Sequence, residues 1–353
     1  MISAMRRKKR RLEDLILCRS FRRGILLVFI VLINATSSFS QNFCTQTLKQ
    51  AQEAFDEGRI SAVPGILEQC LKNGFNKEEK ATAYRLLALT YVYLDEPVKA
   101  DEAMLMLLKF KPEYKINPSV DPSEFINLYN GFRTDPIYRL GVKGGANFMI
   151  IDLVKMNSTN GDIAEEIRIK SNVGFQLGVA SEIPWKNNLE ICPELLFTTK
   201  ELKFDYESAG QRSNYKERVN QVSLPVLLKY SIGKKNYIPT VNAGIEVNYL
   251  ISAIGSTGGH NVSPSTEVTS YRRALGYALV IGSGVKSKFG PGVISAGIRF
   301  FYSLRTSTDK KESYSDNAAY VLSYGMANSL YKMNTFNFNV SYLIPIYKPK
   351  RIK

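Results

Sequence analysis

This chain offers few combinations of residues that could carry out catalysis. Its 353 residues include one histidine, His260, in a glycine-rich stretch with Ser263, Ser265 and Glu267 nearby. A histidine beside a serine and an acid could form the triad of a hydrolase. A triad needs a fixed hydrogen bond between base and nucleophile, which a flexible glycine-rich loop does not hold. The sequence therefore predicts a solvated histidine and no enzyme.

No other pattern indicates a cofactor, a metal or a nucleic acid. One histidine and four cysteines leave little material for a metal site, and the chain lacks a Walker loop and a G-x-S-x-G elbow. Its basic residues are spread along the chain rather than gathered on one face with interleaved aromatics, as a nucleic-acid surface would need. We expect none of the three as a ligand.

The predicted secondary structure changes from helices to strands after Pro136. There the spacing of hydrophobic residues switches from a period of about 3.6 to a period of 2. In Thr240–Ser252 and Phe336–Ile346, apolar residues alternate with polar ones. Eight such segments predict antiparallel strands, each about as long as a tilted strand that crosses a bilayer. They lie at 138–148, 172–182, 189–199, 222–230, 240–252, 275–286, 292–304 and 336–346.

The connections between these segments alternate in length. The connections near 149–171, 200–218, 253–273 and 305–333 are long and polar, and those at 183–188, 231–237 and 287–291 are short. An outer-membrane barrel has short periplasmic turns and long external loops, with both chain termini on the periplasmic side. The alternative is a soluble lipocalin-like barrel, whose apolar stripes would point inward. The even strand count and the alternating loops favour the membrane.

Three segments carry a resemblance to a known family: Leu140-x3-Gly144-Gly145-x-Asn147, Val222-Ser-Leu-Pro-Val-Leu-Leu-Lys-Tyr230 and Gly244-x4-Tyr249-Leu250. Through them, residues 135–353 resemble the PorT-like outer-membrane β-barrel family of Gram-negative envelopes. The resemblance implies a barrel in the cell outer membrane. The family includes secretion-associated members, but these motifs build a barrel and specify no substrate.

Six charged residues lie at strand positions that alternate with the apolar stripes, so their side chains should point into the barrel interior; we call this the inward parity. An eight-stranded barrel is just wide enough for its own side chains, and buried charges are costly unless they pair. We therefore predict a plug of paired charges, which makes a solute channel the weaker alternative. Its members are Lys143, Glu190, Glu194, Lys229, Glu246 and Arg299. Cys192 shares their parity, and we expect it to be a free thiol.

Residues 1–40 are predicted to be a cleaved signal peptide. A basic pair, Arg22 and Arg23, precedes the apolar run Gly24–Ile33, and a small polar stretch follows it to Ser40, after which we place the cut. The apolar run is too short to cross a bilayer, so a membrane anchor is the weaker alternative.

Residues 41–134 show helical spacing and predict helices at 44–57, 60–73, 78–94, 96–111 and 122–132. Asp121 before Pro122 is typical of a helix start, an N-cap followed by proline at the first helical position.

The third and fourth predicted helices resemble a tetratricopeptide repeat (TPR). Tyr84-x2-Leu87-Ala88-x2-Tyr91, Ala100-x3-Met104 and Pro112 carry the pattern, and a generic helical hairpin is the alternative. The resemblance implies a groove for a peptide or protein. Its candidate residues are Tyr84, Leu87, Tyr91 and Met104, most of which we expect to have packing roles.

Cys44 and Cys70 fall on the two helices of the first predicted pair. After export they meet an oxidising compartment, where a disulfide is allowed. We predict this bond, with two buried thiols as the alternative.

The sequence thus predicts an α + β multidomain protein. Signal peptide 1–40 precedes a periplasmic TPR-like helical domain at 41–134 and an eight-stranded antiparallel transmembrane β-barrel at 135–353. The expected role is non-enzymatic. Outer-membrane lipid holds the barrel, and the helical domain binds a periplasmic or outer-membrane protein, as part of a secretion or envelope-assembly complex. The main alternative is a small barrel whose external loops modify lipid or bind a surface.

Overall fold

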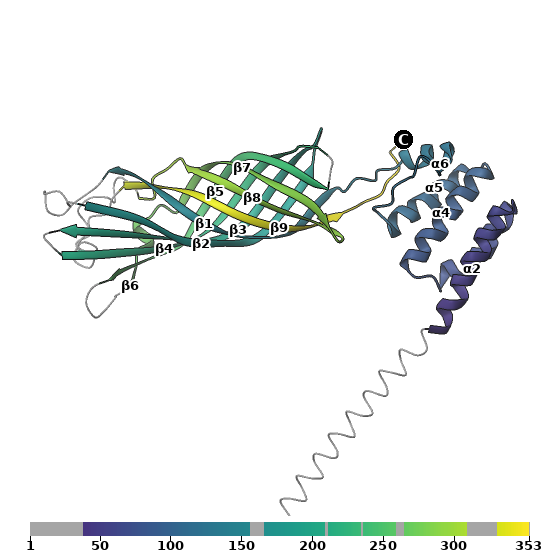
Figure 1. Cartoon of the computed structure of the whole chain (residues 1–353), viewed down its shortest axis with the longest axis horizontal. Coiled ribbons are helices and arrows are strands. Elements are labelled where there is room, and N and C mark those ends of the chain that lie inside the picture. Colours follow the sequence, from purple (N-terminus) through teal and green to yellow (C-terminus); the bar gives the residue numbers. More distant parts are fainter. Residues whose placement is uncertain are drawn as a thin grey trace, which may run out of the picture. The chain divides into compact units, whose positions relative to one another are not determined.

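The computed structural model describes residues 38–155, 166–208, 211–233, 236–258, 265–308 and 330–352. They form two compact units (Figure 1), a helical unit that ends at Asp135 and also includes Lys348–Lys353, and a β unit, Pro136–Tyr347. Residues 1–37 of the predicted signal peptide and His260 lie outside the described residues. No described helix is both long enough and apolar enough to span a membrane.

The helical unit confirms the five predicted helices. Its elements are α2 (Ser38–Asp56), the 3₁₀ turn η1 (Ile60–Ala62), α3 (Val63–Lys72), α4 (Lys77–Tyr93), α5 (Pro97–Phe110) and α6 (Ser123–Asn130). A capping box starts α4, because the Glu79 amide donates to Asn76 Oδ1 at 2.8 Å and the Asn76 amide donates to the Glu79 carboxylate at 3.0 Å. The predicted cut after Ser40 falls in the first turn of α2 and stays a prediction.

Small and large apolar side chains interlock in the core of this unit. Ala51, Ala88, Leu67 and Met104 are fully buried. The alanines let the helices approach closely, and the larger side chains fill the remaining space.

One local prediction is wrong, since Asp121 does not cap α6. The helix follows Pro122 and has no side-chain cap. The Asp121 carboxylate instead accepts from the Asn117 amide at 2.7 Å and from the Arg85 guanidinium at 2.5 Å. A buried carboxylate gains more from a charged donor than from a helix end alone.

The β unit is a closed antiparallel ring of eight strands, which confirms the predicted barrel. Neighbouring strands follow the order β4-β3-β2-β1-β9-β8-β7-β5, and β4 pairs with β5 to close the ring; the short β6 pairs only with β5. The strands are β1 (Tyr138–Lys155), β2 (Glu166–Pro184), β3 (Leu189–Ser208), β4 (Gln211–Ser231), β5 (Tyr237–Gly258), β6 (Ser265–Glu267), β7 (Leu275–Phe289), β8 (Gly292–Ser303) and β9 (Leu330–Ile346).

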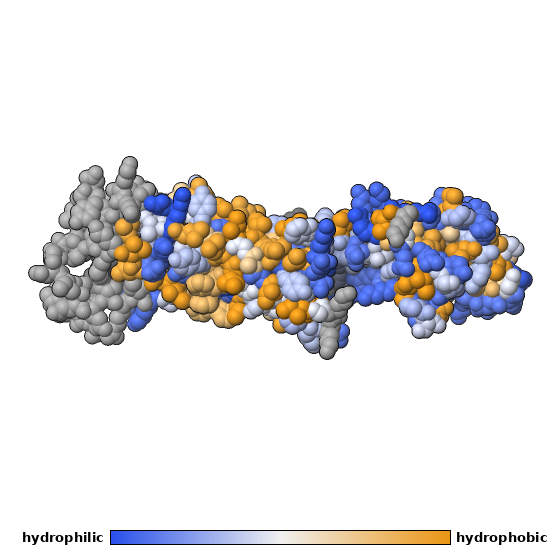
Figure 2. All heavy atoms as spheres, turned by 90° about the horizontal axis from the view of Figure 1, so that it is seen from above, coloured by the Kyte–Doolittle hydropathy of each residue, from blue (hydrophilic) through white to orange (hydrophobic). Residues whose placement is uncertain are grey.

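The apolar stripes point outward. In β5, Val241, Ile245 and Tyr249 are 45%, 56% and 57% exposed, whereas Asn242 and Glu246 point inward and are buried. On the face shown in Figure 2, apolar residues cover much of the barrel wall. A soluble barrel would hide this face, so the lipocalin-like alternative is wrong.

Several strands are longer than predicted, because they continue into the segments expected to be loops. The connection expected at 200–218 is mostly a hairpin in which β3 runs to Ser208 and β4 starts at Gln211. Leu202, Phe204 and Tyr206 alternate with polar residues there, so the alternation that located the other strands extends into this segment and could have revealed the longer strand.

The two ends of the barrel differ. At one end, which we call the short-turn end, β1 begins and β9 ends, paired at Tyr138 and Ile346, and brief connections join β2 to β3, β4 to β5 and β7 to β8. The other end is the long-loop end. Both connections to the helical unit therefore leave from the short-turn end.

Candidate functional site: the charged interior of the barrel

Alternation along the strands brings all six predicted charged side chains into the barrel. Each is 3–6% exposed. Lys143 comes from β1, Glu190 and Glu194 from β3, Lys229 from β4, Glu246 from β5 and Arg299 from β8. Five of the six join ion pairs, and these pairs form two clusters.

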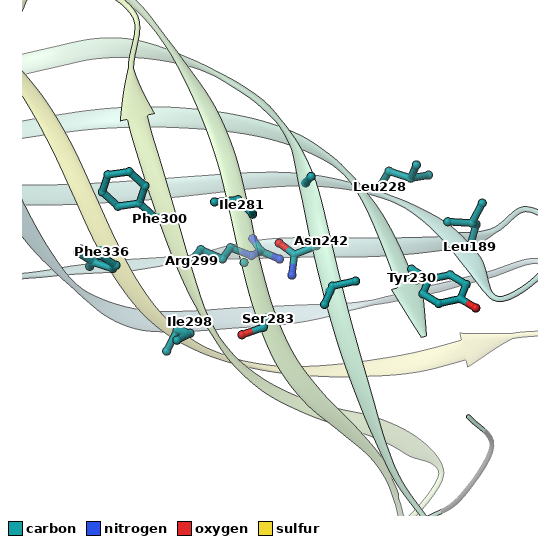
Figure 3. A pocket seen from close by; sticks show the side chains of 13 residues that line it. Leu189, Leu228, Tyr230, Asn242, Ile281, Ser283, Ile298, Arg299, Phe300 and Phe336 are labelled. Carbon is teal, nitrogen blue, oxygen red and sulfur yellow. The ribbon is translucent and has the colours of Figure 1, made fainter. Parts of the chain in front are cut away.

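The first cluster is centred on Glu194. Lys143 Nζ donates to both of its carboxylate oxygens, at 2.8 and 2.9 Å. Arg299 binds the same carboxylate through Nη1 and Nη2, again at 2.8 and 2.9 Å. Arg299 extends from β8 toward Asn242 (Figure 3). One carboxylate thus pairs with two cations across the lumen, and the contacts join β1, β3 and β8.

The second cluster lies toward the short-turn end. Glu190 accepts from Lys286 Nζ at 2.7 Å and from Arg139 Nη1 at 2.9 Å. Glu182 pairs with Lys229 and lies 3.5 Å from Arg139. Sequence reasoning missed Arg139, Glu182 and Lys286, although the parity that found the other charges also applies to them.

Glu246 does not pair as predicted. Within the described parts of the chain we find no ion pair for it, and its carboxylate accepts one hydrogen bond, from Asn248 Nδ2 at 3.3 Å. Two buried cations act on it electrostatically from beyond ion-pair distance, first Lys200 of β3 and then Arg299 of β8. The alternation along a strand predicts that a charged side chain enters the lumen. It does not predict the level along the barrel axis, which decides whether a partner is within reach.

Little space remains between the paired charges. A cavity of about 20 Å³ lies beside Lys143, Glu194, Lys229 and Arg299. One water molecule needs roughly 10–15 Å³ of such space. The cavity holds about one water, so this section of the barrel is filled by its own side chains.

A third cluster, which sequence reasoning did not single out, lies toward the long-loop end. Glu217 is fully buried and receives two hydrogen bonds from Arg272, at 2.7 and 2.6 Å. Tyr215 Oη donates to the same carboxylate at 2.8 Å, and Arg272 lies over the Tyr331 ring. Arg272 follows η2 (Thr269–Tyr271), within a segment expected to be a loop, so no strand pattern could have placed it.

The outer wall carries an apolar groove of about 560 Å³ (Figure 3). Its rim includes Leu228, Tyr230, Ile281 and Phe336, all strongly exposed. In a bilayer, lipid tails cover such a face, so the groove needs no further ligand.

The described residues show no catalytic or metal-binding constellation. No group of three or more His, Cys, Asp or Glu side chains that could hold a metal occurs among them. Ser265 and Glu267 lie in β6, whereas His260 and Ser263 fall outside the described residues. The prediction that these residues form no triad is therefore untested. Cys192 is a buried free thiol.

In the helical unit the structure joins Cys44 and Cys70 by a disulfide between α2 and α3, with their Cα atoms 5.6 Å apart. Gly74 lies against this bond, and a Cβ there would come within 2.4 Å of Cys44 Sγ. The position therefore requires glycine as long as the bond is in place.

The four candidate groove residues divide into two pairs. Leu87 and Met104 are buried and offer no surface to a partner. Tyr84 and Tyr91 are half-buried; Tyr84 stacks on Phe110 at 5.7 Å between ring centres, and Lys99 lies over the Tyr91 ring. Burial raises the pKa of Tyr84.

Arg85 connects α4 to the segment before α6. Its Nε donates to Tyr114 Oη at 2.9 Å, and its guanidinium also binds Asp121. Burial disfavours the charge of Arg85, but these hydrogen bonds outweigh it and raise its pKa. Burial likewise raises the pKa of Tyr114, against the opposing effect of Arg85. The contact is a structural brace.

A family comparison agrees with the barrel architecture. Residues 137–344 match the model of a family described as an outer membrane protein beta-barrel domain. OprG of Pseudomonas aeruginosa is 9% identical, with 60% of this chain and 98% of OprG covered and a TM-score of 0.36. A major outer membrane protein of Thermus thermophilus is 13% identical, with 59% and 99% covered and a TM-score of 0.33. The outer membrane enzyme PagL is 13% identical, with 58% and 99% covered and a TM-score of 0.24. No protein with a curated description matches the chain.

Proposed function

The chain belongs to the outer membrane protein beta-barrel domain family, and from this premise we propose that its barrel is a membrane anchor for a periplasmic protein-interaction domain. The helical unit is that domain, and a secretion or envelope-assembly complex is the setting that we propose. On this proposal the protein is not an enzyme.

The closed lumen is the observation that carries the proposal. Five of the six predicted lumen charges form ion pairs, and the cavity beside them holds about one water. A barrel filled in this way holds a position in the membrane rather than conducting solutes. A conductance in planar bilayers would contradict this part of the proposal.

The connections between the units support a periplasmic helical domain. Both leave the barrel at its short-turn end. In outer-membrane barrels the short turns face the periplasm. The tail is part of the helical unit, since the Arg133 amide donates to the Lys350 carbonyl at 2.9 Å and the Ile352 amide donates to the Gly131 carbonyl at 2.8 Å. The unit is thus tethered to the barrel by two stretches of chain.

The helical unit has features of a binding module. It consists of two helical hairpins, α2–α3 and α4–α5, followed by α6, the arrangement in which TPR-like units stack. Tyr84 and Tyr91 keep part of their rings exposed and are our candidates for partner contact. Aromatic side chains of this kind are frequent energetic anchors at protein interfaces.

A pull-down from outer membranes in mild detergent tests the proposal. We expect the tagged full-length protein to bring down a defined partner that is lost when residues 41–134 are deleted. Heat-modifiable migration in gels would show that the deletion variant still contains a folded barrel. Tyr84→Ala and Tyr91→Ala should weaken capture, and Tyr93→Ala, which alters an exposed tyrosine of the same helix, is the matched control.

Capture of the same partner by the deletion variant would move the function to the barrel and its loops. A lipid-modifying or surface-binding barrel is the second candidate, and it depends on His260. On our proposal His260→Ala leaves partner capture unchanged. Loss of a lipid-modifying activity in this variant would instead favour the second candidate.

A further inference from the structure

A second cavity lies inside the barrel toward the long-loop end, apart from the clusters around Glu194 and Glu190 and next to Arg272 of the third cluster. Its volume is about 40 Å³, and its wall includes inward residues of β3, β4 and β5. Four cationic side chains line it, Lys200, Arg272, Arg273 and Arg305, and none of its described lining residues is acidic. The charges on the described side chains around this cavity are all positive. In the part of the lumen nearer the short-turn end, cations and acids are mixed.

Lys200 lacks the partner that a buried charge needs. It lies on the inward face of β3 and is 6% exposed. Over the described ranges, no hydrogen bond or ion pair reaches its ammonium group. Glu246 acts on it only across a longer distance. A buried unpaired ammonium costs several kcal/mol, so an anion from outside the chain would stabilise this position.

Other contacts hold the neighbouring cations at the cavity wall. Arg305 stacks over the Tyr277 ring, with its guanidinium carbon 4.7 Å from the ring centre. Arg272 is held by the Glu217 carboxylate, and the Arg273 amide donates to the Ser307 carbonyl at 2.8 Å. These groups are positioned before any ligand arrives, which reduces the entropy cost of binding.

We propose that this cavity binds a small oxyanion of the phosphate type. Its volume equals that of about three water molecules, which suits one tetrahedral phosphate group. Guanidinium groups donate in a fork that matches phosphate oxygens, and a lysine ammonium adds a compact charge. The phosphate would supply the anionic partner that the Lys200 ammonium group lacks. This site is independent of the role proposed for the helical unit.

Equilibrium dialysis of the full chain in neutral detergent micelles against radiolabelled inorganic phosphate tests the site. Lys200→Gln and Arg305→Gln should each weaken binding at least tenfold. Lys216→Gln is the matched control, because it removes an exposed cation of β4 outside the cavity, and binding should stay within twofold. Lys200→Arg keeps the charge and should keep most of the affinity. Heat-modifiable migration in gels checks that each variant is folded.

A competition experiment identifies the source of the phosphate group. Phosphatidylcholine vesicles with and without phosphatidic acid, a lipid that carries a phosphate monoester, are added to the labelled complex. Displacement only by vesicles with phosphatidic acid indicates a lipid headgroup, and retention of the label in both cases indicates a free phosphate. The proposal is overturned if the protein binds neither inorganic phosphate nor phosphatidic acid, or if binding survives both Lys200→Gln and Arg305→Gln.

Discussion

The helical unit and the barrel bury opposite kinds of side chain. In the helical unit Leu67 and Met104 are fully buried, and Glu68 and Lys72 form an ion pair in the open. In the barrel Lys143 and Glu194 are buried, and apolar residues such as Ile281 are exposed. Each unit keeps its apolar side chains away from water. In the helical unit they are buried in the core, and in a membrane-spanning barrel they face the lipid on the outside.

This inversion changes what an ion pair does for each unit. An exposed pair is weak, because water and salt screen the attraction. In a filled barrel the charges have no alternative partner in water, so the loss of one member leaves the others buried and unpaired. The two units should therefore respond differently to the same kind of substitution.

The largest difference is expected for Glu194→Gln, which removes the anion shared by Lys143 and Arg299. We expect it to lower the free energy of unfolding of the barrel by about 3–5 kcal/mol. Urea unfolding of the full chain in detergent micelles measures this. Glu201→Gln breaks a more exposed pair with Arg218 and should cost less than about 1 kcal/mol. Equal effects of the two variants would show that the lumen pairs add no special stability.

The disulfide should affect only the helical unit. Cys44→Ser with Cys70→Ser opens a loop with a sequence separation of 26 residues. This should destabilise the helical unit by about 3–4 kcal/mol in the chain-entropy model. Far-UV circular dichroism near the helical minimum follows that unit, and heat-modifiable migration follows the barrel. Cys192→Ala is the control, because this thiol is inside the barrel and should leave helical unfolding unchanged.

Substituting arginine at one exposed apolar position in each unit tests whether that surface faces lipid or water. Ile281 on the barrel wall and Val98 on α5 are 64% and 70% exposed. Ile281→Arg should destabilise the barrel by about 2–4 kcal/mol, because position 281 lies near the middle of β7 and its charge would be held far from water. Val98→Arg should change stability by less than about 0.5 kcal/mol, because it faces water. Unfolding in lipid vesicles compares them, and a neutral Ile281→Arg would refute a lipid-facing wall at that position.

The smallest expected effect concerns a local signal that has no counterpart in the barrel. Asn76→Ala removes one half of the capping box of α4 and should destabilise the helical unit by about 1 kcal/mol. Asn76→Asp keeps an acceptor at the same position and should be close to neutral. The melting temperature of the helical signal distinguishes the two variants.

Local patterns were sufficient for much of the architecture. Alternation with a period of two located the eight strands and assigned Lys143 and Arg299 to the interior, because every second residue of a strand shares a face. Helical spacing located the five helices. Arg139, Glu182 and Lys286 follow the same parity and could have been found in the same way.

Other features depended on contacts that are distant in sequence. Glu217 meets its partner Arg272 across 55 residues of sequence, and Arg272 follows η2, where no strand pattern places it. Asp121 has the local sequence of a helix cap, but Arg85 on a different helix takes its carboxylate. In both cases the deciding contact is with a partner that only the folded chain brings near.

By itself the sequence determined the order of the units, the number of strands and which side chains enter the barrel, since these follow from periodicities of neighbouring residues. Only the tertiary structure decided which charges meet. Closure of the ring sets the height of each strand against the others, so it brings Lys143 and Arg299 to one carboxylate and leaves Lys200 beside a cavity without an acid. Pairing depends on distance across the barrel, and no local pattern encodes that distance.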